Sequence, residues 1–150
     1  DDRNLSRIAA FVRRFGWFPV FGSGRALQQP VFVDDVVAAV LAVLAGRGRD
    51  GACYDLAGPE PLPLARVVEL VGAAVGRRPL QVRIPVRLAL AALRVCRAAG
   101  VQVPVEEEQV LRLREDRTCS IAAARADLGF APLALAAALA RCYPCPGAGP

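Results

Sequence analysis

The sequence contains no histidine, no methionine and no lysine, so all 19 of its basic residues are arginine. Without histidine, the chain cannot form a Ser-His-Asp or Cys-His catalytic arrangement, or a histidine-ligated zinc site. Without lysine, it cannot form a Schiff base, a P-loop or a Tyr/Lys proton relay. We therefore expect this chain to supply no catalytic residue and to hold no metal.

The first residue is also not methionine, because the chain starts with Asp1 and Asp2. We expect it to be a piece of a longer protein. The acidic start is not typical of a signal peptide. The apolar stretch Val86–Val105 is long enough to cross a bilayer, but it contains three arginines, which a membrane interior would penalise. The sequence predicts a soluble cytoplasmic protein without a membrane span.

The chain has 150 residues, of which 55% are apolar and 22% are charged, as expected for one domain's length of folded protein. The net charge is +5, and the arginines are spread from Arg3 to Arg141 instead of forming one block. Two interpretations of the high arginine content are open. It can reflect a compositional bias of the genome, or it can serve a phosphate-bearing ligand, because guanidinium groups bind phosphate through two hydrogen bonds. Aromatic residues make up only 6%, which argues against a nucleic-acid partner.

Five cysteines are present, and their odd number in a core-rich chain argues against a disulfide framework. We expect Cys53, Cys96 and Cys119 to be small buried residues because their neighbours are apolar. Cys142 and Cys145 match the C-x-x-C spacing of redox motifs. They follow an Ala/Leu-rich helix and precede a Pro/Gly tail, which is the wrong context for that chemistry, and their role stays open.

Hydrophobic periodicity predicts an α/β chain with four short strands among six or seven helices. Asp34 and Ser120 are expected to cap the helices that follow them. Helices are predicted over Asn4–Phe15, Asp35–Ala45, Leu64–Val75, Val86–Ala99, from Glu106–Glu108 onward, Ile121–Leu128 and Leu133–Cys142. Strands are predicted over Trp17–Phe21, Pro30–Val33, Ala52–Ala57 and Leu80–Ile84.

The loop Gly22-Ser23-Gly24 carries the first two glycines of a dinucleotide-binding motif, but it lacks the third glycine and is followed by no predicted helix. We therefore do not assign it to a cofactor. The residues after it, Arg25, Gln28 and Gln29, offer one cation and two amides that suit a phosphate or sugar hydroxyls. An ordinary solvated loop explains them as well.

Two further groups of residues have the chemistry of a site. The helix beginning near Asn4 presents free amides, with Arg3 and Arg7 nearby, and would attract an anion if the loop of Arg25 folded toward it. Asp34 and Asp35 form a carboxylate pair, but a cap and a favourable helix dipole explain them without catalysis.

An ordered set of segments along the chain resembles a known pattern. Together they are similar to the C-terminal half of an extended short-chain dehydrogenase/reductase, in the NAD-dependent epimerase/dehydratase family of nucleoside-diphosphate-sugar epimerases. The resemblance covers about residues 1–140, and we expect residues 1–142 to be that part of the fold and 143–150 to be a disordered tail. The segments are Asp2-Arg3-Asn4-Leu5, Phe18-Pro19-Val20-Phe21-Gly22-Ser23-Gly24, Gln29-Pro30-Val31-Phe32-Val33-Asp34-Asp35-Val36, Tyr54-Asp55-Leu56-Ala57-Gly58-Pro59-Glu60, Ile84-Pro85 and Asp127-Leu128-Gly129-Phe130-Ala131-Pro132.

The resemblance implies an N-terminal Rossmann half, absent here, that binds NAD or NADP and carries a Tyr-x-x-x-Lys catalytic pair. This chain alone should then be inactive and should leave a large apolar face exposed. It would line the cleft for a small-molecule substrate of the nucleotide-sugar class, with Arg25, Gln28, Gln29 and, to a lesser degree, Asn4 as binding residues. The resemblance leaves a homodimer open for the full-length protein.

Phe32 departs from the family pattern, because many relatives have histidine or tyrosine there, and phenylalanine cannot form a hydrogen bond with its side chain. A related branch includes an accessory subunit of respiratory complex I, which keeps a nucleotide without turning over a sugar. A non-catalytic nucleotide-binding assembly protein is thus an alternative to the enzyme. A free-standing interaction domain is a third possibility, which a cooperative thermal transition of the isolated chain would support.

Overall fold

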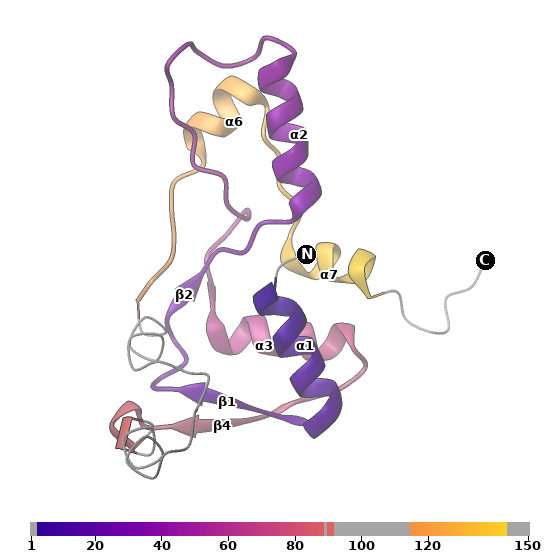
Figure 1. Cartoon of the computed structure of the whole chain (residues 1–150), viewed down its shortest axis with the longest axis vertical. Helices are drawn as coiled ribbons and strands as arrows, with labels where there is room; N and C mark the ends of the chain where they lie inside the picture. Colours follow the sequence, from indigo (N-terminus) through magenta and orange to yellow (C-terminus); the bar gives the residue numbers. More distant parts are fainter. Residues whose placement is uncertain (1–2, 89, 92–114, 144–150) are drawn as a thin grey trace, which may run out of the picture.

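The computed structural model describes residues 3–88, 90–91 and 115–143, and the chain forms two lobes (Figure 1). The sheet lobe contains α1, β1, β2, β3, α3 and β4, and α7 packs on its α3. The helical lobe contains α2, α6 and the segment between α2 and β3. The elements are α1 (Arg3–Phe15), β1 (Trp17–Phe21), β2 (Leu27–Gln28), α2 (Val33–Leu44), β3 (Leu62–Pro63), α3 (Leu64–Ala74), β4 (Leu80–Ile84), α6 (Ala122–Leu128) and α7 (Leu135–Cys142).

A parallel pair of strands, β1 and β4, organises the sheet lobe. Trp17 lies opposite Leu80, and Phe21 lies opposite Ile84. Parallel strands begin at one edge of a sheet and end at the other, so residues that follow both strands come together. β2 and β3 form a second, antiparallel ladder of two residues each. The sequence predicted the bounds of β1 and β4, and the structure confirms them.

Apolar side chains at helical spacing form the core of the sheet lobe. α1 and α3 pack on each other and on β1, and α7 packs on α3. Completely burying a valine or leucine side chain contributes about 1.5–3 kcal/mol. The few buried side chains of this core therefore contribute much of the stability of the lobe. The buried residues are Ala9, Val12, Val20, Val67, Val68, Val71, Leu135 and Leu139.

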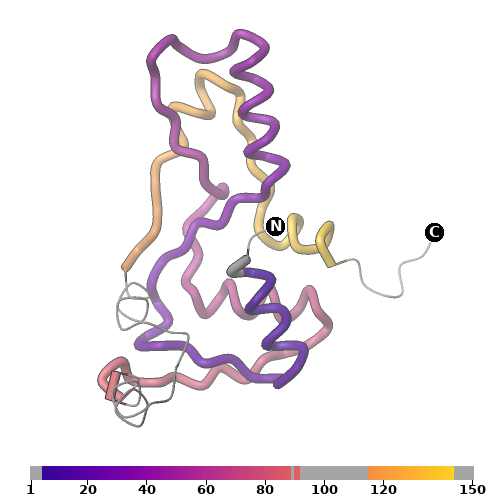
Figure 2. The backbone as a smooth tube through the Cα atoms, in the orientation of Figure 1, coloured from indigo at the N-terminus to yellow at the C-terminus, as the bar shows by residue number. Residues whose placement is uncertain are grey.

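The helical lobe has a separate core between α2 and α6. After α2 the chain turns back and runs beside α6 (Figure 2). Its buried residues are Ala39, Ala57, Ile121, Ala124, Leu128 and Phe130. The two lobes are therefore held by different apolar clusters, and the segments that connect them must be fixed in other ways.

Two predicted strands are wrong. Residues Pro30–Phe32 and Ala52–Ala57 pair with no strand in the described part of the chain, and Val33 already belongs to α2. The strand in this region is β2, at Leu27–Gln28. β-branched and aromatic residues favour an extended backbone, but a ladder also needs a neighbouring strand, which these two segments lack.

The predicted cap of α2 is also wrong, because Phe32 and not Asp34 occupies the N-cap position. Asp34 and Asp35 lie in the first turn of the helix, where negative charge suits the helix dipole as predicted. The Asp35 carboxylate accepts a hydrogen bond from the backbone N–H of Leu133 at 2.9 Å. This bond ties α2 to the segment before α7.

Two of the cysteines predicted to be buried, Cys53 and Cys119, are exposed. The neighbouring sequence was apolar, but the extended segments that carry them lie at the surface.

The N-cap of α6 is Ile121, and Ser120 instead accepts a hydrogen bond from the N–H of Ala122 at 3.5 Å. Several predictions fall outside the described residues: Cys96, Cys145, the helix from Glu106–Glu108, most of Val86–Ala99, and all of the tail except Tyr143.

The outer side of α2 carries an exposed apolar face. Its residues are spaced so that they share one side of the helix, opposite the buried Ala39. This agrees with the apolar face expected for part of a larger fold. The exposed residues are Val33, Val37, Val40, Leu41 and Leu44.

A hydrogen-bonded cluster holds the end of the helical lobe together. The side chain of Asp127, which is 21% exposed, accepts hydrogen bonds from the Tyr54 hydroxyl at 2.9 Å and from Arg49 Nε at 2.8 Å. The Tyr54 hydroxyl in turn accepts a hydrogen bond from the backbone N–H of Arg49 at 2.9 Å. The bonds from Tyr54 first and then Arg49 hold the pKa of the Asp127 carboxyl below its usual value.

The lowered pKa predicts how stability depends on pH. The unfolded chain lacks these bonds, so its Asp127 binds a proton more readily than the folded protein does. The stabilisation is complete above the ordinary aspartate pKa of about 4 and is lost as the pH falls through the lower native value. We expect urea unfolding midpoints, measured from neutral pH downward, to fall more steeply below about pH 4 in the wild type than in Asp127→Asn. Equal slopes for the two proteins would contradict this account.

Candidate functional site

The candidate site begins where β1 and β4 end. The N–H of Gly22 donates a hydrogen bond to the carbonyl of Ile84 at 2.9 Å, which continues the pairing of the strands into the following loop. Gly24 has a φ of +67°, and a Cβ there would lie 2.7 Å from Val20 Cγ1, in the core of the lobe. The loop can therefore make this turn only with glycine at that position.

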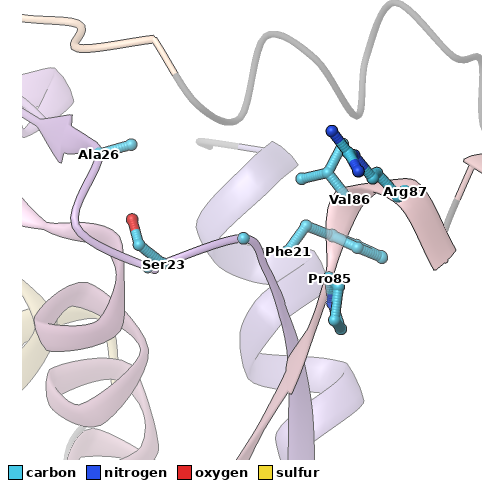
Figure 3. Close-up of a pocket in the computed structure, with 8 residues that line it drawn as sticks. Phe21, Ser23, Ala26, Pro85, Val86 and Arg87 are labelled. Carbon is cyan, nitrogen blue, oxygen red and sulfur yellow. The ribbon is translucent and has the colours of Figure 1, made fainter.

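A cavity of about 380 Å³ lies beside this loop (Figure 3). One wall comes from the β1–β2 loop, including Ser23 and Ala26, and the other comes from the segment after β4. Arg87 provides the cation of this second wall, and Phe21 contributes an aromatic ring. The residues lining the cavity are Phe21, Gly22, Ser23, Gly24, Ala26, Pro85, Val86 and Arg87.

The chemistry of this cavity suits an anionic group attached to a small polar molecule. A guanidinium can bind a phosphate or carboxylate through two parallel hydrogen bonds. The Ser23 hydroxyl accepts a hydrogen bond from the backbone N–H of Arg25 at 3.3 Å, which fixes its position on the loop. Within the residues that the structure describes, no group of three or more histidine, cysteine or acidic side chains could hold a metal ion.

Of the residues predicted to bind substrate, Arg25 lies closest to this cavity along the chain. It is exposed and follows Gly24 directly, although it is not one of the residues that line the cavity. Gln28 is half-buried in β2, where it lies opposite Leu62. The two residues belong to the same turn and strand as the glycine loop, so both remain candidates for contact with a ligand larger than the cavity.

Gln29 occupies a different environment. Its Nε2 donates a hydrogen bond to the carbonyl of Gly58 at 2.8 Å, and its Oε1 accepts one from the N–H of Cys119 at 3.0 Å. Both ends of the amide thus bind backbone groups of two other segments. The structure gives Gln29 a role in joining the segments between the lobes.

Asn4 lies in the first turn of α1. Arg25 belongs to the turn between β1 and β2, so different elements carry the two residues, and their convergence on one anion stays a prediction.

Sequence reasoning missed Arg87. It occurs in the segment Pro85-Val86-Arg87, which the periodicity assigned only to the start of a helix. The available signal was the pairing of two predicted strands, since residues after neighbouring parallel strands meet at one edge. Local pattern alone does not reveal which strands are neighbours.

A second cavity, of about 520 Å³, is an apolar groove between α1, α7 and the start of α2. Phe32, Val36, Leu135 and Leu139 are among its lining residues, and Gln29 and Tyr143 supply polar atoms at its border. Ser6 and Cys142 also line the groove, and among the described residues no group of metal-ligating side chains is found there.

The Gly22–Gly24 loop does not fit the pyrophosphate of a dinucleotide cofactor. The Gly22–Gly24 loop leads into β2 and not into a helix, so no helix N-terminus receives a pyrophosphate there. The residue at the position of the third glycine is Leu27. No reaction step through a nicotinamide group follows from this chain's own residues.

No protein-family model matches the sequence. The curated protein "NADH dehydrogenase [ubiquinone] 1 alpha subcomplex subunit 9, mitochondrial" of Arabidopsis thaliana is 32% identical over 116 residues, which cover 75% of this chain. The chain spans only 29% of the length of that relative.

Two solved structures share the fold. The crystal structure of gox2253 matches 91% of this chain with a TM-score of 0.64 and 22% identity, and the match covers 41% of that protein. The UDP-glucuronic acid 4-epimerase from Bacillus cereus, solved in complex with NAD, matches 92% of this chain with a TM-score of 0.59 and 13% identity, over 35% of its own length.

These likenesses confirm the predicted α/β class and the resemblance to extended short-chain dehydrogenase/reductases of the NAD-dependent epimerase/dehydratase type. The fold that this chain shares is one part of that larger Rossmann-type fold. Among the described residues, no helix is both long and apolar enough to cross a bilayer.

The double hydrogen bonding of Gln29 leads to a prediction. Replacing Gln29 with alanine leaves the carbonyl of the buried Gly58 without a partner, which costs about 1–3 kcal/mol, whereas the N–H of the exposed Cys119 can bind water instead. We expect Gln29→Ala to lower the free energy of unfolding by about that amount. Gln28→Ala is the matched control, because Gln28 is also half-buried and its amide makes no hydrogen bond in the described structure. Equal losses for the two variants in urea titrations would contradict the bridging role of Gln29.

Proposed function

We propose that this chain forms the substrate-binding part of an NAD(P)-dependent nucleotide-sugar epimerase, dehydratase or reductase. The cavity at the ends of β1 and β4 receives the phosphate groups of the substrate. The observation that carries this proposal is the meeting of the glycine loop and Arg87 around one cavity. The fold shared with a UDP-glucuronic acid 4-epimerase supports it.

In this proposal, Arg87 binds the phosphate from one wall, and Ser23 and the loop backbone approach it from the other. Arg25, Gln28 and, more distantly, Asn4 and Gln29 remain candidates for the rest of the substrate. NAD or NADP is bound mainly by the Rossmann half that the resemblance implies, and hydride transfer is the cofactor's own chemistry. This chain orients the substrate and supplies no acid or base.

The test is substrate kinetics of the full-length protein with nucleotide sugars. Losing a guanidinium contact to phosphate costs about 1.5–3 kcal/mol, so Arg87→Ala should raise KM by about 10- to 100-fold with a smaller change in kcat. Arg25→Ala should change KM in the same direction. Arg125→Ala, on the exposed side of α6, is the control and should leave KM unchanged. An unchanged KM in Arg87→Ala with every nucleotide sugar that is turned over would refute the assignment.

A second candidate function is a non-catalytic nucleotide-binding assembly protein. The relationship to the Arabidopsis NADH dehydrogenase subunit favours it. Phe32 is compatible with it, because Phe32 lines the apolar groove and offers no polar group to a substrate. Tight binding of a nucleoside diphosphate by the full-length protein, weakened by Arg87→Ala but without turnover of any nucleotide sugar, would favour this function over the enzyme.

Location and assembly belong to the same proposal. The sequence favours the cytoplasm, whereas the printed name of the Arabidopsis relative places that relative in mitochondria. Fractionation of cells that express the tagged full-length protein would distinguish the two locations. A homodimer stays open for the full-length protein, and its mass in solution would decide it.

A further inference from the structure

The edge of the sheet opposite the candidate site gathers the ends of four elements. The N–H of Leu80 donates a hydrogen bond to the carbonyl of Gly16 at 3.1 Å, and Trp17 lies opposite Leu80 in the ladder. Figure 1 shows the end of α1, the start of β1, the start of β4 and the turn after α3 together at this edge. Residues that flank Gly16 and Leu80 in sequence are therefore neighbours in space.

Three large apolar side chains are exposed at this edge. Phe15 is 51% exposed, Leu80 is 69% exposed and Trp17 is 37% exposed. The ring of Phe11 packs behind them, with its centroid 4.7 Å from that of Phe15 and 5.3 Å from that of Trp17. Contiguous exposed apolar groups of this size mark interaction surfaces more often than isolated ones do.

Four arginines surround these apolar residues. They are Arg13 and Arg14 at the end of α1, and Arg77 and Arg78 just before β4, and all four are exposed. The guanidinium of Arg14 lies over the ring of Phe15, 5.5 Å from its centroid. In the described part of the chain, none of the four forms an ion pair with a carboxylate.

Acidic residues are few in the described part of the sheet lobe, and Asp116 among them contacts β2 through the N–H of Leu27. Residues 3–33 and 61–88 contain ten arginines and a single acidic residue, Glu69. The carboxylate of Glu69 already pairs with Arg66 at 2.9 Å. Among the described residues, the edge therefore presents four arginines without a carboxylate partner around exposed aromatic and aliphatic groups. We call Arg13, Arg14, Phe15, Trp17, Arg77, Arg78 and Leu80 the arginine–aromatic surface.

The shape of this surface selects among anionic partners. None of its residues lines either of the two cavities described above. Stacking of nucleic-acid bases uses a groove with free aromatic faces, whereas here Phe11 packs edge-on against Trp17. A bilayer interface instead combines phosphate headgroups, which attract arginine, with a boundary zone that accepts tryptophan, phenylalanine and leucine.

We infer that the arginine–aromatic surface binds peripherally to the surface of a bilayer that contains anionic phospholipid. The arginines contact lipid phosphates, and Phe15, Trp17 and Leu80 enter the headgroup region. This binding involves no membrane span. It is also separate from the proposed nucleotide site, which lies at the other end of the same two strands.

Trp17 is the only tryptophan in the sequence, so its fluorescence reports on this surface alone. We expect the chain to float with phosphatidylcholine vesicles that contain phosphatidylglycerol, and not with vesicles of phosphatidylcholine only. Binding should shift Trp17 emission to shorter wavelength and protect it from an aqueous quencher. Added salt should weaken binding, because it screens the attraction between arginines and lipid headgroups.

Matched variants distinguish binding through this surface from a general effect of the chain's net charge. Each arginine near an anionic membrane contributes about fivefold to partitioning, so Arg13→Gln with Arg77→Gln should weaken it by about 25-fold. Arg125→Gln with Arg141→Gln removes the same charge from exposed sites elsewhere and should have a much smaller effect. Leu80→Ser should also weaken binding, whereas Leu44→Ser, on the exposed face of α2, should not.

Three results would overturn the inference. The first is no flotation of the wild type with phosphatidylglycerol vesicles at low salt. The second is equal weakening by the two double arginine variants, or by the two leucine variants. The third is binding without any change in Trp17 emission, which would place the contact on another face. Retention of polyuridylate in place of vesicles would assign the surface to RNA. Circular dichroism of each variant confirms that a loss of binding does not come from unfolding.

Discussion

The parallel pairing of β1 with β4 determines what lies at each end of the sheet lobe. At the carboxyl ends, the bond from Gly22 to Ile84 holds the glycine loop next to the segment of Arg87. At the amino ends, the hydrogen bond from the N–H of Leu80 to the carbonyl of Gly16 holds two segments together. Each segment carries a pair of arginines, and the two pairs are far apart in sequence. A slip of one residue in β1 would turn the buried Val20 to the opposite face and would lose both juxtapositions. The register is therefore a condition for the cavity and for the arginine–aromatic surface alike.

Between the lobes, side-chain hydrogen bonds provide the partners for backbone groups that a longer sheet would otherwise provide. The connecting segments are extended but form almost no ladder, so their backbone groups need other partners. Gln29 satisfies Gly58 and Cys119, and Asp35 satisfies Leu133. A polar side chain that already binds backbone groups is less available to a ligand. Gln29 is therefore a weaker candidate for ligand binding than Gln28, although the two are adjacent and chemically identical. The resemblance to the epimerase family selected both, and only their hydrogen bonds distinguish them.

Local pattern was sufficient for the elements that stabilise themselves by packing. The bounds of α1 and α3 agree with prediction to within one residue, because residues such as Val67 and Val71 recur at helical spacing on a buried face. The extended segment Ala52–Ala57 was mistaken for a strand because strand formation depends on a partner elsewhere in the chain. The same limit applies to the site. Arg25 could be selected because it follows the glycine loop in sequence, whereas Arg87 joins that loop only through the pairing of β1 with β4.

The positive charge of the chain raises two separate questions: why its basic residues are all arginine, and why acidic residues are few in one lobe. The proposed bias in genome composition would account for arginine in place of lysine. It acts on the whole sequence, however, and so does not explain where acidic residues are missing. Residues 34–60, which form most of the helical lobe, include Asp34, Asp35, Asp50, Asp55 and Glu60. In the sheet lobe, residues 3–33 and 61–88 hold a single acidic residue, Glu69, and the described segment beside β2 adds Glu115 and Asp116. The positive character of that lobe thus comes from the placement of carboxylates, and this placement leaves Arg13, Arg14, Arg77 and Arg78 free to act on a partner outside the chain.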